Sequence, residues 1–147
     1  MKYLILTLCS ALVISCHSTV TFHGDNTDIK TEIVKFSKHV QKVILLDEED
    51  HFLKHIEPEY KQMQLEQALR GNKAQFLNEF FCGLSGEIHM CMDFDEIIAI
   101  KLLEITDQKN NTYKLKYKLK SKYKEVLNAE VFLIEKDTSF YFYSAAG

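Results

Sequence analysis

The chain has 147 residues, of which 46% are hydrophobic and 12% aromatic, and its formal net charge at pH 7 is −3. This length suits one domain with a single core, and the apolar content excludes a largely disordered protein. The mildly acidic charge gives no general attraction to nucleic acid, so we expect no nucleic-acid partner.

The first 15 residues have the pattern of an export signal. Lys2 precedes an apolar run over residues 4–14, and the small residues Ser15 and Cys16 follow it. A charged start, a short apolar stretch and a small-residue cleavage site are what the export machinery recognises. The run is too short to span a bilayer, which takes roughly 20 apolar residues. We therefore predict a signal peptide over residues 1–15.

The sequence VISC at residues 13–16 resembles the lipobox of bacterial lipoproteins. The resemblance implies that Cys16 becomes the first mature residue and carries fatty acyl chains such as palmitate, which anchor the protein stably when two or more are present. In Gram-negative bacteria an Asp after this cysteine retains a lipoprotein at the inner membrane. The residue here is His17, which implies the periplasmic side of the outer membrane. Cleavage before Thr19 is the alternative, and it would release a secreted or soluble periplasmic protein.

Residues 17–26 are polar, so we predict a lipid-anchored tether over residues 16–26 and a single domain over residues 27–147. The domain begins with a helix that runs to about Leu46 and is capped by Asn26 or Thr27. Its apolar residues recur at spacings of three and four, as on one helical face. They are Ile29, Ile33, Phe36, Val40, Val43 and Ile44.

Three shorter helical segments are predicted next. The acidic cluster at residues 47–50 begins the first, and Pro58 suits the first turn of the second, which ends at Gly71. Asn72 caps the third, which ends at Gly83. The residues of the first that are expected to be buried are Phe52, Leu53 and Ile56. The apolar residues of the second are Tyr60, Met63, Leu65 and Leu69, and those of the third are Phe76, Leu77, Phe80 and Phe81.

After the helices the apolar period changes to two, which indicates β-strands. Residues 88–94 alternate, and residues 97–106 are apolar at both parities, which favours a central strand and leaves a helix open. A turn-rich loop at residues 107–111 predicts a hairpin. Strands over residues 125–135 and 139–143 complete the sheet.

The clearest local pattern lies in residues 113–124, where lysine occupies every even position. Alternate side chains of a strand leave opposite faces, so this pattern predicts a strand with one buried face and one face of ammonium groups. The tyrosines fall on the other face, away from any nucleobase that the lysines would attract. This lysine face is the one predicted binding patch, and it would meet an acidic protein, anionic lipid headgroups or only water. Its members are Lys114, Lys116, Lys118, Lys120, Lys122 and Lys124.

Helices followed by an antiparallel meander of four to five strands give an α+β fold. This element order resembles the cone-shaped NTF2-like domains of small bacterial lipoproteins, over roughly residues 27–147 and without a diagnostic motif. The resemblance implies a cavity between the helices and the sheet, lined by polar residues where such a domain is an enzyme.

Cys82 and Cys91 are the thiols of the predicted mature domain besides the anchor. An exported protein can bridge them, and a loop this short would gain about 2–3 kcal/mol. Strand parity places Cys91 on the face opposite Cys82, so the bridged and the unbridged forms both stay open. Ser85 stands one residue short of a Gly-x-Ser-x-Gly elbow and is expected to be a turn residue.

Two further pairs of side chains have a spacing found in functional sites. His51 and His55 stand at i and i+4, as in zinc sites, but Phe52 occupies the place of a zinc protease's glutamate and no third ligand is nominated. Asp93 and Asp95 would leave one strand face about 7 Å apart, a spacing that permits acid–base chemistry or cation binding. We expect exposed histidines and solvated carboxylates instead, and we predict no metal and no cofactor.

These features predict an envelope protein without a catalytic set. The leading hypothesis is a non-enzymatic, lipid-anchored module that binds a small ligand or another envelope protein. One alternative is an immunity or inhibitor protein against a periplasmic toxin, since complementary charge speeds association. Another alternative is a small hydrolase or isomerase that uses the histidine or aspartate pair in an NTF2-like cavity.

Overall fold

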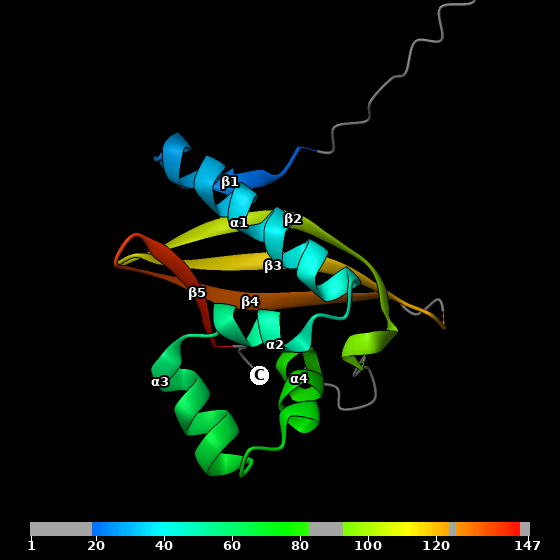
Figure 1. Ribbon diagram of the computed structural model, residues 1–147. Coiled ribbons are helices and arrows are strands. Elements are labelled where there is room, and N and C mark those ends of the chain that lie inside the picture. The colour runs from blue at the N-terminus through cyan, green and yellow to red at the C-terminus, as the bar shows by residue number, and fades with distance from the viewer. Residues whose placement is uncertain (1–18, 83–92, 124–125, 145–147) are drawn as a thin grey trace, which may run out of the picture.

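The computed structural model describes residues 19–82, 93–123 and 126–144 (Figure 1). The fold is α+β, as predicted, with helices in the N-terminal half and most of the sheet in the C-terminal half. The helical segments are α1 (Thr27–Leu45), α2 (Glu49–Phe52), the 3-10 turn η1 (Leu53–His55), α3 (Pro58–Lys61), the π-helix η2 (Gln62–Ala68), α4 (Lys73–Cys82) and the 3-10 turn η4 (Phe94–Glu96). The strands are β1 (Thr21–His23), β2 (Ile97–Lys109), β3 (Thr112–Ser121), β4 (Val126–Lys136) and β5 (Ser139–Ser144).

The long first helix begins and ends where the sequence predicts. The side chain of Asn26 accepts hydrogen bonds from the backbone N–H groups of Asp28 and Ile29, at 3.0 and 3.2 Å. These bonds satisfy two of the donors that a helix start leaves open. One face of α1 packs on the sheet, and its buried residues are Ile33, Ser37, Val40, Val43 and Ile44.

The shorter helices also follow the predicted start and stop signals. Pro58 is the first residue of α3, where its missing N–H costs no hydrogen bond. Gly71 has φ +77°, a conformation that glycine adopts easily, and it separates η2 from α4. Asn72 accepts a hydrogen bond from the N–H of Gln75 at 3.1 Å and so caps α4.

The sheet has the strand order β1-β2-β3-β4-β5 and does not close into a barrel. Strands β2 to β5 form the predicted antiparallel meander, whereas β1 pairs in parallel with β2. Positive φ angles at both residues of each two-residue turn suit the twist of the hairpins. The turn residues are Asn110 and Asn111 between β2 and β3, and Asp137 and Thr138 between β4 and β5.

Two segments differ from the predictions. Residues 21–23 lie in the segment predicted as a tether, yet they form β1, in which Thr21 is opposite Glu104. A three-residue strand is too short to show the alternation of apolar and polar residues that reveals a strand in the sequence. Residues 21–23 form a strand because they pair with β2. The strand predicted over residues 88–94 falls largely outside the described residues, and its last residue, Phe94, begins a 3-10 turn.

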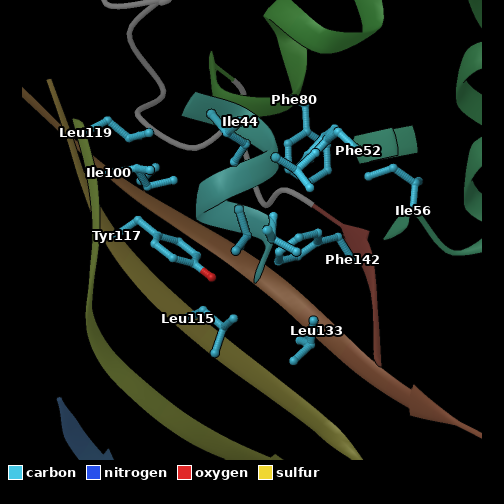
Figure 2. Close-up of a cluster of buried hydrophobic side chains, with 14 of the residues drawn as sticks. Ile44, Phe52, Ile56, Phe80, Ile100, Leu115, Tyr117, Leu119, Leu133 and Phe142 are labelled. Carbon is cyan, nitrogen blue, oxygen red and sulfur yellow. The ribbon is translucent and has the colours of Figure 1, made fainter. Parts of the chain in front are cut away.

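The core fills the space between the helices and one face of the sheet. Figure 2 shows Phe52 and Phe80 of the helical layer facing Phe142, and Leu115, Tyr117 and Leu119 of β3 lying on the sheet side. Phe52 and Phe80 meet edge to face, with ring centroids 5.3 Å apart. The NTF2-like cone that the element order suggested stays a prediction.

Candidate functional site

The lysine face of β3 lies on the side of the sheet opposite the helices. The odd positions of β3 point into the core, and Leu115 and Leu119 are fully buried. The even positions point away from the core, and Lys118 and Lys120 are exposed. The structure therefore places Lys114, Lys116, Lys118 and Lys120 in one row on the face of the sheet that points away from the helices. Lys122 follows the strand in a turn, and Lys124 lies outside the described residues.

The half of this row nearest the β2–β3 hairpin is neutralised by carboxylates. Lys114 Nζ lies 3.3 Å from Glu130 Oε2. Lys116 stands directly between Glu104 of β2 and Glu130 of β4 in the strand register. Opposite charges on neighbouring strands stabilise a sheet modestly, so this half of the row contributes to the fold.

The other half of the row places like charges together. Lys118 lies directly opposite Lys101 of β2, and Lys120 lies opposite Ala99 on β2 and Val126 on β4. Within the described part of the chain, no ion pair involves any of these three lysines. Like charges directly across a sheet are destabilising, so the fold gains nothing from this arrangement. We call Lys101, Lys118 and Lys120 the basic end.

Large apolar side chains are exposed beside the basic end. Ile98 is 48% exposed, Val126 47% and Tyr123 72%. Ile98 lies at a register shift of β2, and Tyr123 comes two residues after Ser121, the last residue of β3. Exposed apolar groups rimmed by cations are typical of surfaces that bind another molecule.

His51 and His55, which stand at a zinc-like spacing in the sequence, lie beside a third histidine that the sequence did not nominate. The ring of His39 on α1 lies 5.9 Å from that of His51 and 5.1 Å from that of His55, measured between centroids. The rings of His51 and His55 are stacked at 6.2 Å, and His51 Nδ1 lies 3.1 Å from Glu48 Oε2. His39 sits twelve residues before His51 on another helix, so no local spacing could reveal it.

The surroundings of His55 in this cluster favour its neutral ring. Burial, and then the neighbouring charges of His39, His51 and Lys54, lower the pKa of His55 to about 4. Its Nε2 atom is buried, with no hydrogen-bond partner among the described residues. No three or more His, Cys, Asp or Glu side chains of residues 19–82, 93–123 and 126–144 are grouped so that they could hold a metal ion.

The aspartate pair is not arranged as predicted. Asp93 precedes η4 and Asp95 lies within it, so the strand geometry that would set their carboxylates about 7 Å apart does not apply. The reason is that the chain turns here before entering β2. Asp95 Oδ2 instead lies 3.3 Å from Lys122 Nζ, which ties η4 to the end of β3.

Glu57 is a buried carboxylate that no sequence pattern predicted, and its hydrogen-bond partners indicate a structural role. Glu57 accepts hydrogen bonds from Lys136 Nζ and from the N–H of Tyr60, both at 2.7 Å. Burial alone raises the pKa of Glu57, but these bonds and the charge of Lys136 outweigh it and hold the pKa below its usual range. The ion pair therefore fastens the start of α3 to β4.

The three cysteines predicted to carry a lipid or a disulfide, and the turn serine, lie at the edge of the described residues or outside them. Cys82 is the last residue of α4, and its side chain is not described. Cys16, Ser85 and Cys91 lie outside the described residues, so the lipid anchor and the disulfide stay predictions.

The comparisons with known proteins give no family for this chain. No family model matches it. A search of the curated proteins finds no match either. Among the helices in the described part of the chain, none is both long and apolar enough to cross a membrane.

Proposed function

We propose that this protein is an exported, lipid-anchored envelope protein that acts by binding rather than by catalysis. The basic end carries the proposal, because Lys101 and Lys118 repel each other across an uncovered face. Stability does not explain two like charges in this position, whereas an anionic partner does. The neutralised half of the same strand shows that the chain uses carboxylates elsewhere to balance its lysines.

The start of the described chain supports an anchor close to the domain. Residues 1–15 have the export pattern, and Cys16 ends the lipobox-like sequence. β1 begins at Thr21, so few residues separate the proposed lipid from the sheet. A domain held this closely works beside a membrane rather than at a distance from it.

The side-chain pairs considered for catalysis support a binding role as well. His55 presents a buried nitrogen to its neighbours and stays neutral at ordinary pH. Asp95 is engaged with Lys122, on a turn rather than on a cavity-lining strand. A pKa of about 4 suits His55 poorly for acid–base catalysis near neutral pH, and Asp95 is paired with Lys122 rather than with Asp93.

The test is the intact mass of the protein extracted from the membranes of an expressing Gram-negative bacterium. The expected product lacks residues 1–15 and carries a diacylglycerol on Cys16, and C16S abolishes this modification. C9S changes a cysteine inside the predicted signal peptide and serves as the matched control, since it should leave the lipid in place. A wild-type protein that keeps Met1, or that is recovered in the soluble fraction with an unmodified Cys16, would overturn the anchor.

A further inference from the structure

We infer that the basic end lies flat on an anionic lipid surface when the protein is anchored. The inference rests on the lipid anchor proposed above, because that anchor would hold the basic end close to the membrane surface. The surface consists of Lys101, Lys118 and Lys120 with the exposed apolar side chains of Ile98, Tyr123 and Val126.

The strand register brings the chain into the sheet from the direction of the basic end. β1 is parallel to β2 and begins with Thr21 opposite Glu104, three residues beyond Lys101, so the chain enters β1 from the direction of Lys101. The first residue of β2, Ile97, is opposite Ser121, the last residue of β3. Figure 1 shows β1 above the middle of β2, with both strands running from right to left.

Side chains around this entry point are also cationic. Val20, which immediately precedes β1, lines a surface hollow together with Lys38 of α1 and Lys101 of β2. A negatively charged surface that approached the start of β1 would therefore meet ammonium groups from two elements. Lys118 extends the same charge to the next strand.

The distances allow the anchor and the basic end to reach one membrane. Three residue steps separate Cys16 from Thr19, which span at most about 10 Å when extended. From strand spacing and rise, Val20 lies roughly 20 Å from Val126 across the sheet. A bilayer that holds the lipid on Cys16 is thus within reach of the whole basic end, with no further linker.

The chemistry of the surface suits the headgroup region. Lysines next to an anionic leaflet gain favourable electrostatic energy that falls off within a Debye length. Apolar side chains such as Ile98 and Val126 can enter the boundary between headgroups and acyl chains, and tyrosine is enriched at this depth. The acidic residues 47–50 lie in the helical layer, on the other side of the sheet and away from the lipid.

An introduced tryptophan reports this contact cleanly, because the chain contains none. V126W places the fluorophore at the basic end, and M63W places one on the helical layer at nearly equal exposure, 47% against 51%. Each lipid-anchored protein is reconstituted in vesicles of brominated phosphatidylcholine, with or without brominated phosphatidylglycerol. We expect V126W to be quenched about twofold more strongly when phosphatidylglycerol is present, and less so at high salt, whereas M63W should not respond.

Charge reversal tests the lysines themselves. In the V126W protein, K101E/K118E/K120E should abolish the response to phosphatidylglycerol. The matched control K35E/K54E/K61E changes the net charge equally on the helical layer and should retain the response. Equal quenching of V126W with and without phosphatidylglycerol, or a response that survives K101E/K118E/K120E, would overturn the inference and leave the basic end to an acidic protein.

Intact mass before reconstitution separates this inference from the proposed function. A protein without lipid on Cys16 refutes both. A lipidated protein that enters the vesicles and whose V126W fluorophore ignores phosphatidylglycerol refutes the membrane contact alone.

Discussion

On β3, the face toward the helices and the face toward solvent differ in what their side chains do for the fold. Leu115 and Leu119 are fully buried in the core. The lysines between them leave the other face, where Lys116 is balanced by carboxylates and Lys118 meets another lysine. Stability explains the buried face and half of the exposed face. The other half costs stability, which makes it the place to look for function.

The largest expected effect comes from the buried face. Leu115→Ala should lower the free energy of unfolding by about 3 kcal/mol, because it removes a fully buried side chain and leaves a cavity. Lys116→Ala, the next residue on the same strand, should change it by less than about 1 kcal/mol. Urea unfolding followed by circular dichroism measures both. Similar losses for the two variants would contradict the assignment of the faces.

A smaller effect is expected from the hydrogen bond that this buried face makes with α1. Tyr117 Oη lies 2.8 Å from Ser37 Oγ of α1, in the core. Burial raises the pKa of Tyr117, and the bond to Ser37 offsets part of this rise. Tyr117→Phe should lower the free energy of unfolding by about 1–2 kcal/mol, because it leaves the Ser37 hydroxyl with one partner fewer.

A double-mutant cycle with Ser37→Ala checks that contact. The double variant should be less destabilised than the sum of the two single variants, since both remove the same hydrogen bond. Simple additivity would mean that the two hydroxyls do not interact.

Acid should lower the free energy of unfolding through His55, which lies in the helical layer. Its pKa of about 4 in the folded protein lies below the value of about 6.5 expected in the unfolded chain. The unfolded chain therefore binds the proton first, so stability is complete above about pH 6.5 and falls as the pH drops toward 4. With an allowance for solvent screening, the loss should be about 1–2 kcal/mol.

Unfolding free energies measured across this pH range test the prediction. His55→Gln should remove most of the fall in unfolding free energy at low pH. The control His23→Gln removes an exposed histidine that lies 3.4 Å from Glu104, and it should leave most of that fall in place. A dependence of unchanged size in His55→Gln would show that another group controls it.

The smallest effects separate the two halves of the exposed face. Lys118→Gln removes a like-charge contact and should raise stability by about 0.5 kcal/mol, whereas Lys116→Gln removes a balanced charge and should lower it by a similar amount. High salt should shrink both changes, because these charges are exposed. Urea midpoints at low and high salt provide the measurement, and shifts of equal sign would contradict the distinction.

Local sequence signals predicted much of this fold. The cap at Asn26, the proline at the start of α3 and the alternation along β3 each depend on neighbouring residues alone, so their structures could be read from the sequence. β1 and the 3-10 turn η4 could not be predicted in this way, because an element of three residues is too short to show a repeating pattern of apolar residues. His39 was missed for a related reason, since only the packing of α1 against α2 brings it beside His51.

The sequence by itself determined the α+β order and the two faces of β3, because periodicity and short motifs act over a few neighbouring residues. The tertiary structure alone decided which lysines are balanced. Strand register sets Glu104 and Glu130 beside Lys116 but Lys101 beside Lys118, and register depends on pairing between segments far apart in the chain. That pairing divides a uniform row of lysines into a half balanced by carboxylates and a half in which like charges meet.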